Sequence, residues 1–207
     1  MRVTLPNDWS DINIGKYQEI YALTKLPDTL VLEKDIKMLS IITGLSEDII
    51  GSVDIEDYAA MMEQLQFIMT LPSAEHIPTQ IKFDGVKYDL QMRVDKLKLA
   101  QYIDLELLSK TSDEIIYNMH KILAIFLSNT KQYNTEDMLR RAEIFKAKMT
   151  MDIAYPITVF FYLNYMTLLD GIQNYLVEEA KKQVKELNQK LPTTTTRGGN
   201  GILFWKN

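Results

Sequence analysis

The 207-residue sequence contains no cysteine. Disulfide frameworks and thiolate metal sites are therefore excluded, and a reducing, intracellular setting is the natural expectation. Histidine is scarce as well: His76 and His120 are the only two, and neither has a second histidine nearby in the sequence. A zinc site is therefore not expected. We expect no cofactor and no metal.

A surplus of positive charge is also missing. The net charge of −5 and the isoelectric point near 5.2 argue against a nucleic-acid partner, because proteins that bind the phosphate backbone usually carry a basic face. Charged residues make up 25% of the chain and hydrophobic residues 46%, which is typical of a globular protein. The length allows one sizeable domain or two small ones.

No long hydrophobic run is present. The best candidate, residues 153–169, contains Pro156 and Asn164 and is shorter than the roughly 20 apolar residues that spanning a membrane requires. The sequence therefore predicts a buried helix here, with membrane association as the weaker alternative. The first residues, MRVTLPNDWSD, lack the apolar core of a signal peptide.

Most of the chain shows the periodicity of amphipathic helices. In residues 97–110 this pattern predicts a helix in which Leu99, Tyr102, Ile103 and Leu107 face inward, and residues 112–126 read as one helix. A long helix is expected from residue 153 through Gly171 to Leu191. Helix boundaries are predicted at Asn13 and Asn134, which offer side-chain caps, and at Gly44, which suits a left-handed end.

One β-hairpin is expected, at residues 79–90. Asp84-Gly85 lies between two short alternating runs, and this dipeptide suits a two-residue turn with positive φ at both positions. Whether residues 3–5 pair with the hairpin is left open. The predicted fold is mainly α, in two similar helical halves. The expected divisions are helical residues 1–78, the hairpin 79–90, helical residues 91–191 and a flexible tail, 192–207, with an apolar end.

Segments of the two halves resemble one another. IGKYQEIYAL (14–23) matches LAQYIDLELL (99–108), and KMLSIITG from Lys37 matches KILAIFLS from Lys121 at nearly the same offset. Amphipathic patterning alone can produce such similarity, so chance remains an alternative. A genuine repeat predicts a pair of related helical units.

No residue motif specifies a reaction, and we expect no catalytic residue. The acidic pairs begin expected helices, where negative charge complements the helix dipole; they are Glu47/Asp48, Glu56/Asp57, Asp113/Glu114 and Glu136/Asp137. Asn118 and His120 lie on an otherwise apolar helix, which favours a satisfied polar pair over a general base. The Gly-rich residues 197–201 have no preceding strand or following helix and indicate a linker.

Three sets of apolar residues are candidates for binding a partner protein. The first is the end of the tail, where large apolar side chains would be costly to leave in water. The second is a narrow stripe in the last helix that is close to a coiled-coil seam and allows a homo-oligomer. The third is a methionine-rich helix, since methionine adapts to varied partners. Their members are Ile202, Leu203, Phe204 and Trp205; Leu176, Val184 and Leu187; and Met61 and Met62.

Several segments appear in a characteristic order: WSDINIGKY (9–17), KDIKMLSIITGLS (34–46), residues 81–90, QYID (101–104), NMHKILA (118–124) and Phe160-Phe161. In this order the chain resembles small proteins encoded in the structural-gene blocks of tailed bacteriophages, especially those of Bacteroidetes hosts, which are often taken to be tail assembly chaperones. The resemblance covers the chain up to about residue 190. It has no catalytic residues to carry over.

The resemblance implies a non-enzymatic, mostly helical protein that acts in the host cytoplasm during virion assembly by binding a larger tail protein. One alternative is a structural component, such as a connector, ring or tail protein, that is retained in the virion. Another is an enzyme whose carboxylates converge from distant segments, an arrangement that sequence alone does not reveal.

Overall fold

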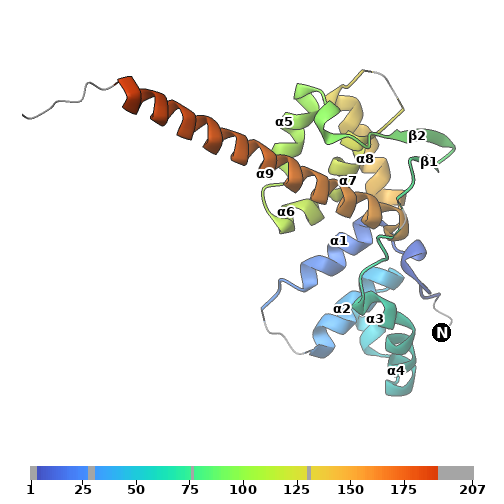
Figure 1. The fold of residues 1–207 in the computed structure, drawn as a ribbon. Coiled ribbons are helices and arrows are strands. Elements are labelled where there is room, and N and C mark those ends of the chain that lie inside the picture. Colours follow the sequence, from blue (N-terminus) through green and yellow to red (C-terminus); the bar gives the residue numbers. More distant parts are fainter. Residues whose placement is uncertain (1–3, 28–30, 76, 130–131, 191–207) are drawn as a thin grey trace, which may run out of the picture. The chain divides into compact units, whose positions relative to one another are not determined.

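The computed structural model describes residues 4–27, 31–75, 77–129 and 132–190, and only the backbone at 94, 172 and 186–190. Within these residues the fold is mainly α with a small three-stranded antiparallel sheet, which confirms the predicted fold class (Figure 1). The helices are α1 (Ile14–Leu23), α2 (Val31–Thr43), α3 (Glu47–Gly51), α4 (Ile55–Gln64), α5 (Leu99–Leu108), α6 (Ser112–Tyr117), α7 (Met119–Phe126), α8 (Thr135–Lys148) and α9 (Met151–Lys190).

The first helices surround a core of their own. Helices α1 to α4 and the short 3-10 helix η2 (Leu65–Met69) enclose a cluster of buried apolar side chains. The predicted boundaries are confirmed, because the Asn13 side chain accepts from Lys16 N at the start of α1 and Gly44 has a φ of +74° after α2. The cluster consists of Leu5, Ile20, Met38, Leu39, Ile42, Ile50 and Leu65.

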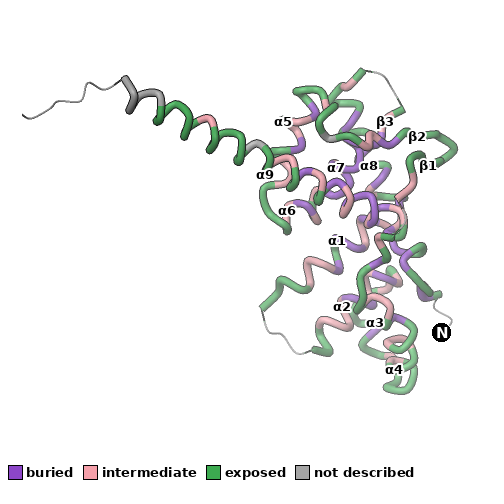
Figure 2. The backbone as a smooth tube through the Cα atoms, in the orientation of Figure 1, coloured by how far each residue is buried: buried purple, intermediate pink, exposed green. Residues whose placement is uncertain are grey.

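A second core forms around α7, which is buried along its whole length (Figure 2). A helix that is apolar on every side needs cover on every side, and α5, α6 and α8 pack against α7. Phe126 at the end of α7 stacks on Phe161 of α9 with ring centroids 3.5 Å apart. This contact sets the N-terminal part of α9 against α7.

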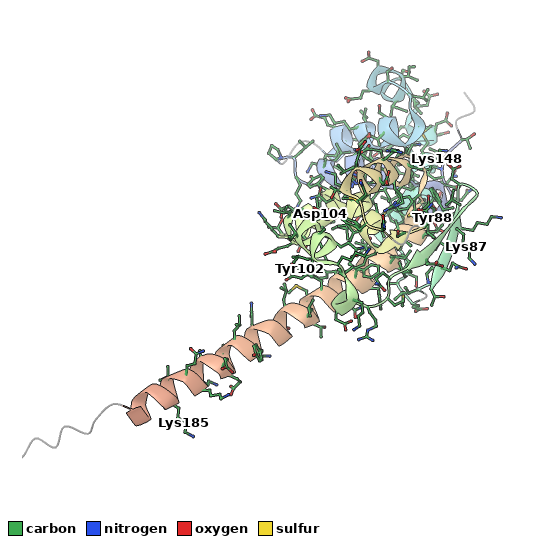
Figure 3. All side chains as sticks on the ribbon, turned by 90° about the horizontal axis from the view of Figure 1, so that it is seen from above. Lys87, Tyr88, Tyr102, Asp104, Lys148 and Lys185 are labelled. Carbon is green, nitrogen blue, oxygen red and sulfur yellow. The ribbon has the colours of Figure 1, made fainter. Side chains whose placement is uncertain are left out.

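The hairpin is confirmed as strands β1 (Gln80–Phe83) and β2 (Val86–Leu90). Asp84 and Gly85 have φ values of +49° and +77°, as the two-residue turn requires. A short third strand, β3 (Leu127–Ser128), pairs with β2 and was not predicted. The turn is held to the end of α8, where Lys148 Nζ lies 2.9 Å from Asp84 Oδ2. Lys148 is labelled in Figure 3.

The backbone around Asn13 joins the N-terminal helices to the α8–α9 junction. Asn13 forms an antiparallel bridge with Thr150, flanked by the bonds Ile14 N to Met149 O (2.9 Å) and Met151 N to Ile12 O (2.8 Å). Asn13 Nδ2 also donates to Ala147 O at 2.9 Å. One residue therefore caps α1 and fixes the end of α8.

Two predictions about the middle of the chain are wrong. The side chains of Leu99, Ile103 and Leu107 on α5 are exposed, and the helix instead buries Gln101 and Leu105. Gln101 turns inward because its Nε2 donates to Ile125 O and its Oε1 accepts from Lys98 N, at the start of its own helix. Residues 112–126 form two helices, because the chain bends at Asn118 between α6 and α7.

The contacts divide the chain into two units, Met1–Tyr165 and Met166–Asn207. The predicted long helix is confirmed as α9, which continues through Gly171 and carries Pro156 in its second turn. The two segments of the proposed repeat are both ten-residue helices, α1 and α5. Their common origin stays a prediction.

Candidate protein-docking groove

An apolar groove of about 200 Å³ opens on the first unit, where α6 and α7 lie beside α1 and the N-terminal part of α9. Its floor consists of buried side chains, including Ile115, Met119 and Thr158. Leu71 and Tyr162 lie at its rim, and 63% of Leu71 is exposed. The lining side chains are Tyr17, Leu71, Ser112, Ile115, Ile116, Met119, Tyr155, Thr158, Val159 and Tyr162.

Among the residues that the structure describes, none of the side chains lining the groove is charged. The Thr158 hydroxyl on the floor donates to Ala154 O at 2.8 Å, so this polar group is already bonded within its own helix. A cavity of roughly 150 Å³ is large enough for benzene, so this groove has room for a large apolar side chain. Such a site suits an aliphatic or aromatic anchor better than a charged ligand.

The bend at Asn118 brings α6 and α7 to the groove at different angles. The Thr111 side chain accepts from Glu114 N and the Glu114 carboxylate accepts from Thr111 N, so a capping box fixes the start of α6. At the other end, Asn118 Nδ2 donates to Leu108 O at 3.3 Å. A capping box and a side-chain hydrogen bond therefore fix the two ends of α6, which lines the groove.

A polar network lies beside the groove. Asp113 accepts from Tyr21 Oη at 2.6 Å and pairs with Lys25 Nζ at 2.8 Å. The pKa of Asp113 is lowered by the Lys25 ammonium first and by the Tyr21 hydroxyl second. Tyr21 also stacks on Tyr17, whose phenol pKa is raised by burial. These groups hold α1 against α6, and the lowered pKa favours the ionised form of the Asp113 carboxylate.

His120 is buried next to this region, and its hydrogen-bond partner is Gln18 of α1, whereas Asn118 bonds the Leu108 carbonyl. His120 Nδ1 lies 3.1 Å from Gln18 Nε2, and His120 Nε2 lies 3.9 Å from Glu143 Oε1. Burial, followed by the charges of Lys121 and Lys146, lowers the pKa of His120 to about 4. The ring is therefore neutral at physiological pH and is bonded to a side-chain amide.

The acidic pairs all lie in the first turns of helices α3, α4, α6 and α8, which confirms their predicted positions. Within the described residues no group of three or more His, Asp or Glu side chains gathers at a distance suited to a metal ion.

A tyrosine elsewhere is held protonated, since burial and a hydrogen bond to Asp104 raise the pKa of Tyr133.

A second, more polar cavity of about 430 Å³ lies between β2, the start of α5 and the end of α7. Asp89, Lys96, Lys98 and Tyr133 contribute to its lining, as does the buried Gln101. Gln101 already bonds Ile125 O and Lys98 N, and the two lysines are exposed. Nothing in this lining selects a particular ligand.

The residues predicted to bind a partner lie in three different settings. Met61 and Met62 are half-buried against the N-terminal core. Leu176 and Val184 are exposed on the C-terminal part of α9, which belongs to the second unit. The side chain of Leu187 and residues Ile202, Leu203, Phe204 and Trp205 are outside the described residues.

The groove itself was not predicted. Its residues come from α1, the segment after η2, α6, α7 and α9, and each looks like an ordinary core residue within its own helix. The only available signal was Leu71, an apolar residue that directly precedes Pro72 outside the predicted helices.

The chain matches no family model, no curated protein and no solved structure. Among the described residues, no helix is both long enough and apolar enough to cross a membrane.

Proposed function

We propose that this chain is a non-enzymatic assembly protein of a tailed bacteriophage, which binds an apolar segment of a larger tail protein in the host cytoplasm. The observation that carries the protein-binding part is the exposed apolar groove lined by Leu71, Ile116 and Tyr162. The ordered resemblance of segments along the chain supports the viral part. The absence of charge in the groove lining fits an apolar anchor.

The partner segment carries at least one large aliphatic or aromatic side chain, which fills the groove. Burial of such a side chain contributes about 1.5–3 kcal/mol, and hot spots of this kind dominate many interfaces. A single anchor gives modest affinity. The apolar residues 202–205 provide a second contact in this proposal, and linking two contacts raises the overall affinity through effective concentration.

The test is a pull-down from infected cells with the full-length chain, read by mass spectrometry. The groove variants are Leu71→Glu and Ile116→Glu, and a third bait lacks residues 192–207. Leu139→Glu on α8 is the matched control, since Leu139 is also an exposed leucine but does not line the groove. Thermal melting of each bait establishes that it is folded.

We expect the full-length chain and Leu139→Glu to recover a long tail protein, and the groove variants to recover at least about tenfold less, the loss expected from about 1.4 kcal/mol of binding energy. Equal recovery by all baits would exclude the groove as the binding site. Recovery of connector or neck proteins, with the chain present in purified particles, would instead identify a structural virion component. Recovery of no partner by any bait would remove the protein-binding proposal and favour the enzyme alternative.

A further inference from the structure

Apolar side chains of the second unit form an exposed stripe along α9. Figure 2 shows that α9 passes from buried to exposed along its length. In the second unit Leu176 is 59% exposed and Val184 56% exposed. In proteins most of the stability of a helix comes from packing of its amphipathic face. A helix with this stripe is therefore expected to pack its apolar face against a complementary surface.

The stripe follows the helical period. Leu169, Leu176, Ala180 and Val184 recur at spacings of seven, four and four residues, which places them on one face. The sequence continues the same spacing at Leu187 and Leu191. The small side chain of Ala180, in the middle, allows the backbones of two helices to approach closely.

The charges beside the stripe indicate what covers it. Glu179 and Lys181 directly precede and follow Ala180, so at 3.6 residues per turn they lie on opposite flanks of the stripe. When two parallel copies of a helix pair about a two-fold axis, each flank meets the opposite flank of the partner; in an antiparallel pair, like flanks meet. Parallel pairing therefore sets Lys181 opposite Glu179 of a second copy, whereas antiparallel pairing sets like charges together.

The existing contacts of these charges do not oppose that arrangement. Lys181 Nζ lies 2.8 Å from Glu178 Oε1 within the same helix, and both side chains are more than half exposed. An exposed pair of this kind contributes little, about 0–1 kcal/mol, and its ammonium can turn to a partner. Lys185, which Figure 3 shows on this part of α9, lies on the Lys181 side of the helix, and Asp170 lies on the same side about three turns before Lys181.

We infer that the C-terminal part of α9 is a dimerisation helix, which pairs in parallel and in register with the same helix of a second copy of this chain. A copy supplies both the apolar stripe and the two complementary flanks, so the surface is complementary to itself. In a parallel pair, the C-termini of both helices lie at the same end of the dimer. The inference does not depend on the proposed function, because it rests on the second unit alone.

Sedimentation equilibrium of the full-length chain over a range of concentrations tests the association. We expect a mass of twice 24.0 kDa for the natural sequence and a monomer for the double variant Leu176→Glu/Val184→Glu. Tyr175→Glu is the matched control, because Tyr175 is an exposed apolar residue on the same helix but lies away from the stripe. A monomer at every concentration, or equal dissociation by the control and the stripe variant, would overturn the inference.

The absence of natural cysteine allows the orientation to be tested separately. In a parallel pair in register, Leu176→Cys and Val184→Cys each place two thiols at the same level, and each variant alone should form a disulfide dimer under mild oxidation. In an antiparallel pair centred on Ala180, cross-linking would require a mixture of the two variants. Cross-linking only in the mixture would overturn the parallel arrangement, and no cross-linking in any combination would overturn the pairing.

Discussion

Gln18 Nε2 lies 3.1 Å from His120 Nδ1, which brings together two buried polar side chains 102 residues apart in the sequence. The same amide nitrogen lies 2.9 Å from the carbonyl oxygens of Ile116 and Tyr117. A single side chain of α1 thus bonds the last turn of α6 and the start of α7. This contact connects the N-terminal helices to the second core, next to the proposed docking groove.

Replacing Gln18 should destabilise the first unit. Gln18→Leu removes an amide group that can donate at most two hydrogen bonds to the acceptors around it, which are the Tyr117 carbonyl, the Ile116 carbonyl (also bonded by Asn118 N) and His120 Nδ1. Each buried group left unsatisfied costs about 1–3 kcal/mol. We expect a loss of at least about 2 kcal/mol in the free energy of unfolding, measured by urea denaturation followed by circular dichroism. Glu19→Ala is the control, since Glu19 is exposed on the same helix. Equal stability of the two variants would show that the contact contributes nothing.

Stability should fall as the pH falls from about 6.5 toward 4. The folded pKa of His120 is about 4 and its ordinary value is 6.5, so the unfolded state binds more protons in this window. The free energy of unfolding therefore decreases on acidification, by up to about 1.4 kcal/mol per pH unit for one proton. A protonated Nδ1 would also direct a hydrogen at the Gln18 amide. Chemical denaturation at successive pH values measures the slope.

A substitution of His120 tests whether this residue causes the dependence of the free energy of unfolding on pH. The charged groups that act on His120 are Lys121 and Lys146, which disfavour its protonation, and Glu143, which favours it. His120→Gln keeps a neutral acceptor and should flatten the curve between pH 6.5 and 5, above the range in which most carboxylates titrate. The same slope in the wild type and in His120→Gln would refute the assignment.

The Asn13 side chain should contribute to the stability of the fold through two separate hydrogen bonds. Its Oδ1 caps α1 by accepting from Lys16 N at 2.8 Å, and its Nδ2 donates to Ala147 O at 2.9 Å. Loss of an N-cap alone costs about 0.5–2 kcal/mol. We expect Asn13→Ala to lose both contributions, and Asn13→Asp to keep the cap and lose only the donation. The order of melting temperatures should be wild type, Asn13→Asp, Asn13→Ala, and identical values for the wild type and Asn13→Asp would exclude the second bond.

Features that depend on local chemistry were predictable from the sequence. Asp84-Gly85 specified the hairpin because few residue pairs tolerate positive φ at both turn positions. Asn13, Gly44 and Asn134 marked helix ends because their side chains, or the absence of one, satisfy the local backbone. These signals need no knowledge of the rest of the chain.

Features that depend on distant contacts were not predictable. Strand β3 consists of two residues, and only the nearby edge of β2 defines it. Gln101 is polar, yet it is buried because Ile125 supplies a carbonyl from α7. The docking groove combines five segments, and its residues are indistinguishable from core residues until those segments meet. Periodicity identifies an apolar face but does not say whether that face is covered.

The α5 helix offers a direct test of whether an apolar face identified from periodicity is covered in the folded protein. Leu99, Ile103 and Leu107 are exposed on one face, whereas Leu105 is buried on the other. We expect Ile103→Glu to change the free energy of unfolding by no more than about 0.5 kcal/mol, as surface substitutions usually do. Leu105→Ala should cost about 2–5 kcal/mol, because it leaves a cavity in the core.

Both α5 variants are measured by urea denaturation at neutral pH, with Leu107→Glu as a second exposed position. The reverse result, in which Ile103→Glu unfolds the protein and Leu105→Ala is tolerated, would show that α5 buries the face of Leu99, Ile103 and Leu107 and exposes that of Leu105. A loss of stability in Ile103→Glu that depends on protein concentration would have a different meaning. It would show that α5 is covered by another molecule in solution, since intramolecular packing does not depend on concentration.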